Sequence, residues 1–275
     1  MTTANGNETT GWGLKTAATV TMLIDHLGAA LMEPYMMKNG FTGILQPLDA
    51  ICRLIGRAAF PIYIFCLVEG FEKTRSRAKY LARLIIVGIL TEPCFDIGIG
   101  LTRAEVLSGK LVQFRYQNIF VTLAVGMIAM ILMDGLRSLL PERTEKKIGP
   151  AEVLVFIGQV LIAAALCWCN EFVLKGDYGW NGVAAICAAY LIRKSRLFFT
   201  GSAGEKNRAV LWAAIVPLAF NSLAEFAGLM MLPLVGSYNG KRGRKGNRWF
   251  FYAFYPVHLL VLGIIRLSMD WPPIV

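Results

Sequence analysis

Residues 115–137 read RYQNIFVTLAVGMIAMILMDGLR, and no charged side chain occurs in positions 119–133. An uninterrupted apolar run of this kind is typical of a helix that crosses the hydrocarbon core of a bilayer. Similar runs recur along the 275-residue chain, which is 56% hydrophobic, only 17% charged and has a mean hydropathy of +0.53. This composition excludes a soluble domain and predicts an all-α fold, a polytopic transmembrane helical bundle.

The apolar runs predict about nine spans, with eight to ten as the range, in a single integral-membrane domain covering residues 1–275. The predicted spans cover residues 14–37, 44–71, 79–100, 115–137, 152–170, 178–193, 208–221, 222–238 and 250–269. Residues 1–12 are polar and lack a basic n-region, so we expect no cleavable signal peptide and interpret the first span as an anchor. The six cysteines fall mostly inside spans, where we expect them to serve as packing residues.

Lysines and arginines gather in the connections at residues 73–79, 143–147, 193–208 and 241–248. The positive-inside rule places such connections in the cytoplasm. All of them share one side only if two helices lie between residues 208 and 238, so we divide that run near Asn221. The N-terminus is then cytoplasmic, and the chain is a multi-pass protein of the cell membrane. Because basic loops face anionic lipid, the net charge of +10 needs no nucleic acid to explain it.

The chain has only two histidines, His26 and His258, and each lies within a long apolar run. Ionisable side chains at such a depth are functional-site candidates. Lys15 precedes His26 on the first span, and their spacing places both on one helix face, about 16 Å apart along the axis. Asp25 points about 100° away from His26, so we expect any carboxylate that orients His26 to come from another helix.

Further polar residues fall inside other predicted spans. Arg53 and Arg57 share one helix face, and Glu92 is followed by Pro93, which interrupts helical hydrogen bonding. This combination predicts a polar cavity within the bundle. The alternative is a structural ion pair between the helices that carry Arg57 and Glu92.

Polar residues near the span ends have both a structural and a binding interpretation. Asn118 opens one span, and Asp177 and Tyr178 open another, on the predicted outer side. They either cap helices and form an aromatic belt or contact a substrate. The loop at 238–243 places glycines beside basic residues, which suits either a phosphate or a lipid headgroup, although it matches no nucleotide-binding fingerprint.

An ordered set of motifs runs through nearly the whole chain. It comprises Lys15 with Asp25-His26, GRAAFPI at 56–62 with Glu69-Gly70, YLARL at 80–84 with TEP at 91–93, NIFVT at 118–122, DYG at 177–179, YNGKRG at 238–243 and FYAFYPVH at 251–258. This set resembles the TraX family. The resemblance implies N-terminal acetylation of a conjugative pilin subunit, and a relation to transmembrane acyltransferases that move acyl groups from cytoplasmic acyl-CoA to acceptors across the membrane. In those relatives a basic residue upstream of a histidine marks the catalytic helix, as Lys15 and His26 do.

The resemblance and the residue chemistry together predict an acyltransferase with acetyl-CoA, or another acyl-CoA, as co-substrate and without a metal. His26 is the expected general base, with Asp25 or Glu92 setting its tautomer. Arg57 is expected to stabilise the thioester oxyanion or bind a CoA phosphate, and His258 to meet the thioester or carry the acyl group. The expected phosphate-binding residues are Lys15, Tyr238, Asn239, Gly240, Lys241 and Arg242. The expected acceptor-binding residues are Asn118, Asp177 and Tyr178.

The acceptor class stays open at this level: a peptide N-terminus, a glycan and a lipid-linked sugar all carry a suitable amine or hydroxyl. A second class of function also fits the buried charges, because a proton-coupled transporter or flippase needs the same kind of relay. The sequence shows no matching interrupted helices in its two halves, which such transporters often have. A metal site built from His26, His258, Asp25 and Glu92 lacks paired-ligand spacing on any one helix.

Overall fold

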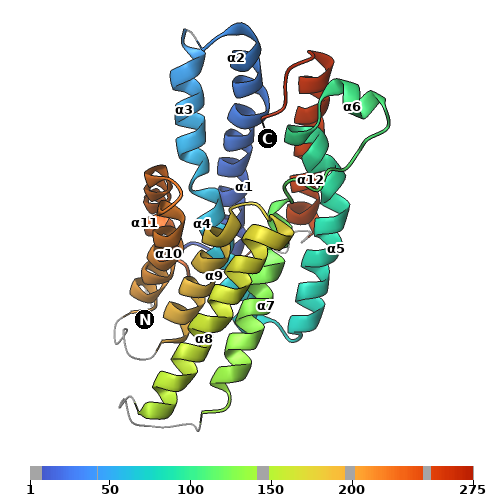
Figure 1. Cartoon of the computed structure of the whole chain (residues 1–275). Coiled ribbons are helices and arrows are strands. Elements are labelled where there is room, and N and C mark those ends of the chain that lie inside the picture. The colour runs from blue at the N-terminus through green and yellow to red at the C-terminus, as the bar shows by residue number, and fades with distance from the viewer. Residues whose placement is uncertain (1–7, 42, 141–148, 196–201, 244–248, 275) are drawn as a thin grey trace.

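The computed structural model describes residues 8–41, 43–140, 149–195, 202–243 and 249–274. Within these residues the fold is helical, with two isolated β-bridges and no strand (Figure 1), which confirms the predicted all-α class. Residues 141–148, 196–201 and 244–248, which hold parts of the basic connections, lie outside the described residues.

The first half of the chain forms long helical segments with irregular turns inside them. Helix α1 (Gly11–Leu27) continues through a π-helical turn (Gly28–Met32) into α2 (Glu33–Asn39). The second predicted span is divided into α3 (Leu45–Gly56) and α4 (Ala59–Lys73), and the third comprises α5 (Arg77–Phe95) and a π-helical turn (Asp96–Gly100). The short α6 (Arg103–Leu107) follows.

The second half adds the helices that complete the bundle. They are α7 (Ile119–Arg137), α8 (Pro150–Trp168) with a π-helical end (Cys169–Leu174), α9 (Gly179–Lys194), α10 (Ala203–Ala219), a 3₁₀ helix (Leu223–Met231), α11 (Leu232–Gly236) and α12 (Trp249–Ser268). The helical run at 208–238 is interrupted between α10 and the 3₁₀ helix, which is where the sequence predicts a division near Asn221.

Helical length and composition suggest a membrane protein. In the described ranges, the stretches Leu45–Lys73, Ile119–Arg137, Pro150–Leu174 and Trp249–Ser268 are long and apolar enough to cross a membrane. Helices α9 and α10 are shorter, at 16 and 17 residues. The count of nine spans and the cytoplasmic N-terminus therefore stay predictions.

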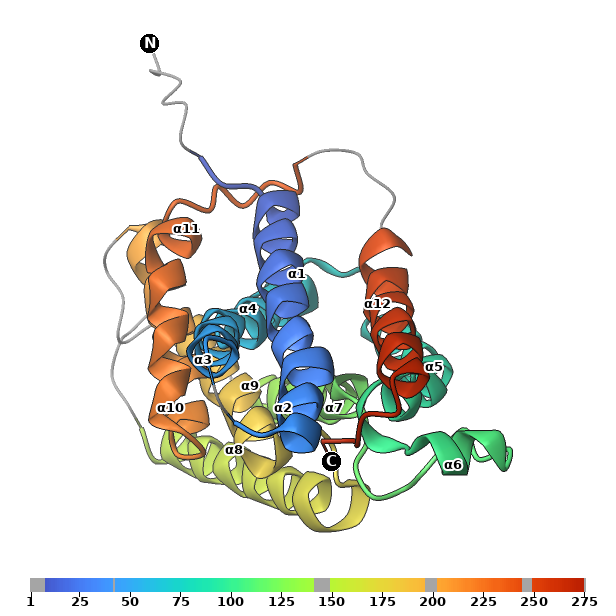
Figure 2. The same ribbon diagram turned by 90° about the horizontal axis from the view of Figure 1, so that it is seen from above.

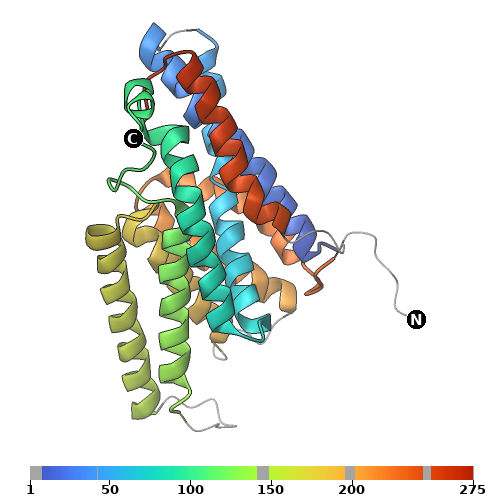
Figure 3. The same cartoon turned by 90° about the vertical axis from the view of Figure 1, so that its right-hand side faces the viewer.

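The core lies where α4, α7, α9 and α10 pack together, and large buried side chains such as Ile62, Phe65, Met130 and Tyr190 fill it. Helix α8 lies at the edge of the bundle beside α7 and α9 (Figure 2), and only 6% of its apolar stretch is buried. Helix α12 lies along α1 (Figure 3), and their N-terminal ends meet where the rings of Trp12 and Phe251 pack 4.8 Å apart. The space that this pairing leaves between α1, α4 and α12 holds the candidate site.

Candidate functional site

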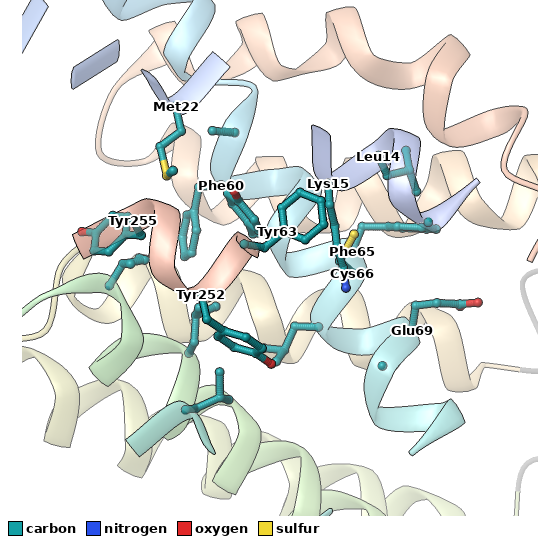
Figure 4. Close-up of a pocket in the computed structure, with 18 of the residues that line it drawn as sticks. Leu14, Lys15, Met22, Phe60, Tyr63, Phe65, Cys66, Glu69, Tyr252 and Tyr255 are labelled. Carbon is teal, nitrogen blue, oxygen red and sulfur yellow. The ribbon is translucent and has the colours of Figure 1, made fainter. Parts of the chain in front are cut away.

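A cavity of about 680 Å³ lies between α1, α4, α5, α7 and α12, and its lining includes many aromatic side chains, among them Phe60, Tyr63, Phe65, Tyr252 and Tyr255 (Figure 4). The cavity brings together part of the predicted site: Lys15, Asp25, His26, Asp177, Tyr178, Tyr238, Gly240 and Arg242 all line it. The remaining predicted site residues, Arg57, Glu92, Asn118, Asn239, Lys241 and His258, are not among its lining residues. Its volume is in the range of pockets that hold small molecules and cofactors.

Helix α1 places a cation and an imidazole along the wall of this cavity. Lys15 lies near the end at which α1 and α12 begin, with its Nζ 5.8 Å from the centre of the Phe251 ring. His26 lies about 16 Å farther along the helix axis. Both side chains line the cavity, as their spacing on the helix predicts.

The two histidines of the chain contact each other. His26 Nδ1 lies 2.6 Å from His258 Nε2, and the two rings stack with centroids 4.9 Å apart and planes 10° from parallel. His258 comes from α12 and is buried, and its Nδ1 lies 2.7 Å from the carbonyl oxygen of Phe254, one turn earlier in the same helix. The sequence identifies both histidines as candidates, but it gives no sign of this contact because 232 positions separate them.

The hydrogen bonds fix the tautomers of the two neutral rings. The Phe254 carbonyl can only accept, so Nδ1 of His258 carries a proton and donates it. His258 Nε2 is then an acceptor, and His26 Nδ1–H donates to it. The lone pair of His26 is consequently on Nε2, to which no group in the described residues is hydrogen-bonded. A ring in this state is set up to take a proton from a reactant in the cavity.

The carboxylates expected to orient His26 have other partners. Asp25 accepts from Arg53 at 2.8 Å and lies 4.0 Å from Arg57, while Glu92 accepts hydrogen bonds from the side chain and, at 3.2 Å, the backbone of Asn118. The orienting group of His26 is therefore His258 in place of Asp25 or Glu92. The alternative ion pair between Arg57 and Glu92 is also wrong, because Arg57 pairs at 3.0 Å with Glu225.

The loop at 238–243 lies against the start of α1. Thr9 N–H donates to Ser237 O and Asn239 N–H donates to Thr9 O, each at 3.0 Å, and the N–H groups at the start of α1 donate to the carbonyls of Lys241 and Arg242. The N–H of Lys241 is taken by the Asn239 side chain at 2.9 Å. These backbone groups are thus used within the protein and are not available to a phosphate.

Two further cations line this end of the cavity that the sequence reading does not single out. Lys73, at the end of α4, donates to the Gly240 carbonyl and the Tyr238 hydroxyl and pairs with Glu69. Arg83 of α5 lies over the ring of Tyr80 at 5.3 Å. Within the described residues, neither Lys15 nor Arg83 has a carboxylate partner. Helical spacing in the sequence places Lys73 on one face with Cys66 and Glu69, which could have pointed to it. A cation at the end of a span is usually explained by membrane topology instead.

The predicted acceptor-binding residues divide into two groups. Asn118 is fully buried and caps α7, accepting from Phe120 N–H at 2.9 Å and donating to the Gly88 carbonyl at 2.9 Å. Asp177 and Tyr178 line the cavity instead, and the Tyr178 ring stacks on Phe60 with centroids 4.1 Å apart. Tyr178 has a φ of 62°, a left-handed conformation that is a genuine outlier for an aromatic residue and is typical of functional sites.

The structure also adds two residues that sequence reasoning missed. Tyr255 of α12 lines the cavity, and its ring lies edge-on to His26 with centroids 5.9 Å apart. Glu225, in the 3₁₀ helix, is fully buried and is the carboxylate partner of Arg57. Tyr255 falls in an aromatic stretch that is typical of a membrane interface, and Glu225 falls in an apolar run, so neither carries a distinctive spacing.

Comparisons with known proteins agree with the motif order. The family model described as "TraX protein" matches residues 11–266. A protein of Dichelobacter nodosus described as "Probable fimbrial assembly protein FimC, serogroup H1" is 25% identical over 263 residues, which is 94% of this chain and 96% of that relative. No solved structure gives a significant match.

Proposed function

Because the chain belongs to the TraX family, we propose that it is a membrane acyltransferase that moves an acyl group from acyl-CoA to an amine or hydroxyl of an acceptor. One observation carries this proposal most directly. His26 lines a cavity large enough for a thioester substrate, with Nδ1 engaged by His258 and the lone pair on Nε2. A general base in this position is what acyl transfer to an amine or hydroxyl requires.

The charges along the cavity support one orientation of acyl-CoA. Lys15, Arg83 and Arg242 gather at the end where α1 and α12 begin, and we assign the CoA phosphates to them. Lys15 and His26 lie about 16 Å apart along α1, and many of the side chains that line the cavity are aromatic. Such a lining suits an extended, weakly polar pantetheine arm. The thioester then lies beside His26, near Tyr255 and Tyr178.

The chemical steps use His26 twice. The acceptor nitrogen or oxygen attacks the thioester carbonyl carbon while His26 Nε2 takes its proton. The C–S bond of the tetrahedral intermediate then breaks, and His26 Nε2 gives this proton to the departing CoA sulfur. The products are the acylated acceptor and free CoA thiol. Tyr255, whose ring lies edge-on to His26 in the cavity lining, is our candidate hydroxyl donor to the oxyanion in place of Arg57, which pairs with Glu225 and is not among the lining residues.

The test is a comparison of two variants on the same face of α1. Purified protein in lipid nanodiscs is titrated with acetyl-CoA, and the release of free CoA thiol is followed over time. We expect the wild type to bind acetyl-CoA and to release thiol slowly, with water as the acceptor. His26→Ala should keep binding but lose thiol release by about 100-fold, whereas Lys15→Ala should weaken binding and leave the rate at saturation largely unchanged.

Two outcomes would count against the proposal. If wild-type protein binds no acetyl-CoA at millimolar concentration, the cations at the end of the cavity do not bind CoA phosphates. The buried charges would then fit a proton-coupled transporter better. Equal thiol release by wild type and His26→Ala would remove His26 from the chemistry, whatever the affinity for acetyl-CoA.

A further inference from the structure

Helix α6 and the chain that follows it form a projection at one end of the bundle. Residues 103–116 lie on the connection from α5 to α7, and α6 lies to the side of the other helices, next to α5 (Figure 2). We name these residues the α6 projection. No residue of α6 itself is buried, and no residue of the α6 projection lines the cavity. The site described above therefore gives this segment no role.

The α6 projection exposes large apolar side chains. Leu107 is 77% exposed and Phe114 is 81% exposed, and Leu111 and Tyr116 also lie at the surface. Scattered apolar residues on a surface are ordinary, but four large ones within ten positions of one short segment indicate an interaction surface.

The surface of α5 indicates what covers these side chains. Helix α5 comes directly before the α6 projection and exposes a row of apolar side chains: Ile85, Ile86, Ile89 and Leu90. On a helix at the edge of a membrane bundle, such a row faces lipid. The α6 projection follows at the end of this row, where the acyl chains of a bilayer give way to the headgroups.

The charges of the α6 projection fit headgroups of one sign. Lys110 pairs with Glu105 at 2.6 Å, whereas Arg103 and Arg115 have no carboxylate partner in the part of the chain that the structure describes. The positive-inside rule disfavours cations in this connection, because it places the preceding one, between α4 and α5, in the cytoplasm. Cations beside exposed apolar side chains are typical of a segment that lies on an anionic membrane surface.

Buried groups fix the α6 projection on both sides of Phe114. Gln113 N–H donates to the fully buried carboxylate of Asp96 at 2.7 Å. On the other side, Gln117 N–H donates to the Lys175 carbonyl at 2.9 Å. The stretch between these two anchors is short, so Phe114 is held at the surface and cannot fold back into the bundle.

We propose that the α6 projection docks on the headgroups of anionic phospholipids, in the outer leaflet if the predicted orientation holds. Leu107 and Phe114 enter the boundary between headgroups and acyl chains, and Arg103 and Arg115 bind the negative headgroups. Docking also bears on the cavity. The N–H of Asp177, a cavity-lining residue, donates to the Gln117 carbonyl at 2.9 Å, so the docked segment is bonded to the cavity wall. The inference does not depend on acyl transfer.

The experiment measures lipid contact at Phe114 itself. A fluorophore is attached to Phe114→Cys in nanodiscs that contain a small fraction of nitroxide-labelled lipid, either phosphatidylglycerol or phosphatidylcholine. A nitroxide quenches only fluorophores close to it. We expect phosphatidylglycerol to quench about fivefold more effectively than phosphatidylcholine at equal mole fraction, since each cation near an anionic surface favours it by about that factor. Adding Arg103→Gln and Arg115→Gln should make the two lipids quench equally.

Matched controls separate this contact from general effects. The unmodified chain, treated in the same way, gives the signal of the native cysteines, which is subtracted. Lys38→Gln removes a cation from α2 and should keep the full preference for phosphatidylglycerol. A fluorophore at Ile89→Cys, on the exposed row of α5, should be quenched by both lipids alike. The side chains of Arg103, Phe114 and Arg115 are exposed, so we expect these variants to fold.

Two results would overturn the proposal. If neither lipid quenches the fluorophore at position 114 while both quench it at position 89, the α6 projection does not lie on the membrane, and its apolar side chains fit a protein partner instead. If both lipids quench equally at position 114 in the chain with Arg103 and Arg115 intact, the contact does not depend on charge and anionic lipid is not recognised.

Discussion

The contact between His26 and His258 gives each ring a separate task. His26 lines the cavity and His258 does not, so only His26 is placed to touch a substrate. His258 holds Nδ1 of His26 and is itself held by the Phe254 carbonyl. We therefore regard His258 as a positioning residue and no longer favour the acyl-carrying role that the sequence allowed.

This division of roles predicts a specific kinetic effect. His258→Ala should lower kcat by roughly 10- to 100-fold, because the tautomer and ring orientation of His26 are no longer fixed, while KM for acetyl-CoA changes little. Steady-state thiol release in nanodiscs measures both constants. Val261→Ala, on the exposed side of α12 and not among the residues that line the cavity, is a control for general damage to that helix. A large rise in KM with unchanged kcat would instead place His258 in the binding of CoA.

Gly56 is required by the close approach of α1 and α3. A Cβ atom at this position would overlap the side chain of Asp25, including its Cβ. Gly56→Ala should therefore destabilise the protein by about 1–3 kcal/mol and lower thiol release, since Asp25 is next to His26. Gly135→Ala is the matched control: a Cβ there meets nothing within 4 Å, so the change should be neutral or slightly stabilising in a thermal unfolding assay. Equal melting temperatures for the two variants would show that α1 and α3 can separate without cost.

Single residues show where sequence reasoning succeeds and where it stops. Lys15 and His26 share a cavity because helical periodicity fixes their relative direction within one element. The partners of Asp25, Glu92 and Arg57 could not be predicted in this way, because they depend on which helices are neighbours. Glu225 shows this most clearly, since an isolated carboxylate in an apolar run has no spacing that points to Arg57.

At the scale of elements, Asn118 is important for the start of α7. It caps the helix through Phe120 N–H and binds Glu92 of α5, so it joins two helices at a buried position. We expect Asn118→Ala to lower stability by about 2 kcal/mol or more, because the cap is lost and the buried carboxylate of Glu92 loses its side-chain donor and keeps only the backbone N–H. Ser202→Ala, at the exposed cap of α10, should cost only about 1 kcal/mol.

The same comparison separates structure from binding at Asn118. Thermal unfolding of both variants gives their stability, and thiol release at increasing concentrations of a peptide with a free N-terminus gives the use of an acceptor. If Asn118→Ala keeps wild-type stability but no longer uses the acceptor, the acceptor-binding role that the sequence predicts is the correct one. The division near Asn221 follows from the positive-inside rule, whereas the π-helical turns at Gly28–Met32 and Asp96–Gly100 have no equivalent signal in the sequence.

At the scale of the whole molecule, the α4–α5 connection and α6 lie at opposite ends of the bundle (Figure 1). The positive-inside rule puts the α4–α5 connection in the cytoplasm. A membrane-impermeant maleimide added to intact cells should therefore label Ser108→Cys and leave Arg75→Cys unlabelled until the membrane is opened. The unmodified chain is the blank, because its own cysteines lie in helices. Labelling of Arg75→Cys alone would invert the predicted orientation and move the acyl-CoA end of the cavity outside the cell.

The peripheral position of α8 determines how the protein responds to bilayer thickness. Its helical stretch Pro150–Leu174 has 25 residues, about 38 Å of helix, against a hydrocarbon core of about 30 Å. Such an excess is relieved by tilting. Because α8 contributes no residue to the cavity, it can tilt without moving His26 or its partners. Thiol release should accordingly vary less than about twofold between nanodiscs of shorter-chain and longer-chain phosphatidylcholine, while the tilt of α8 changes.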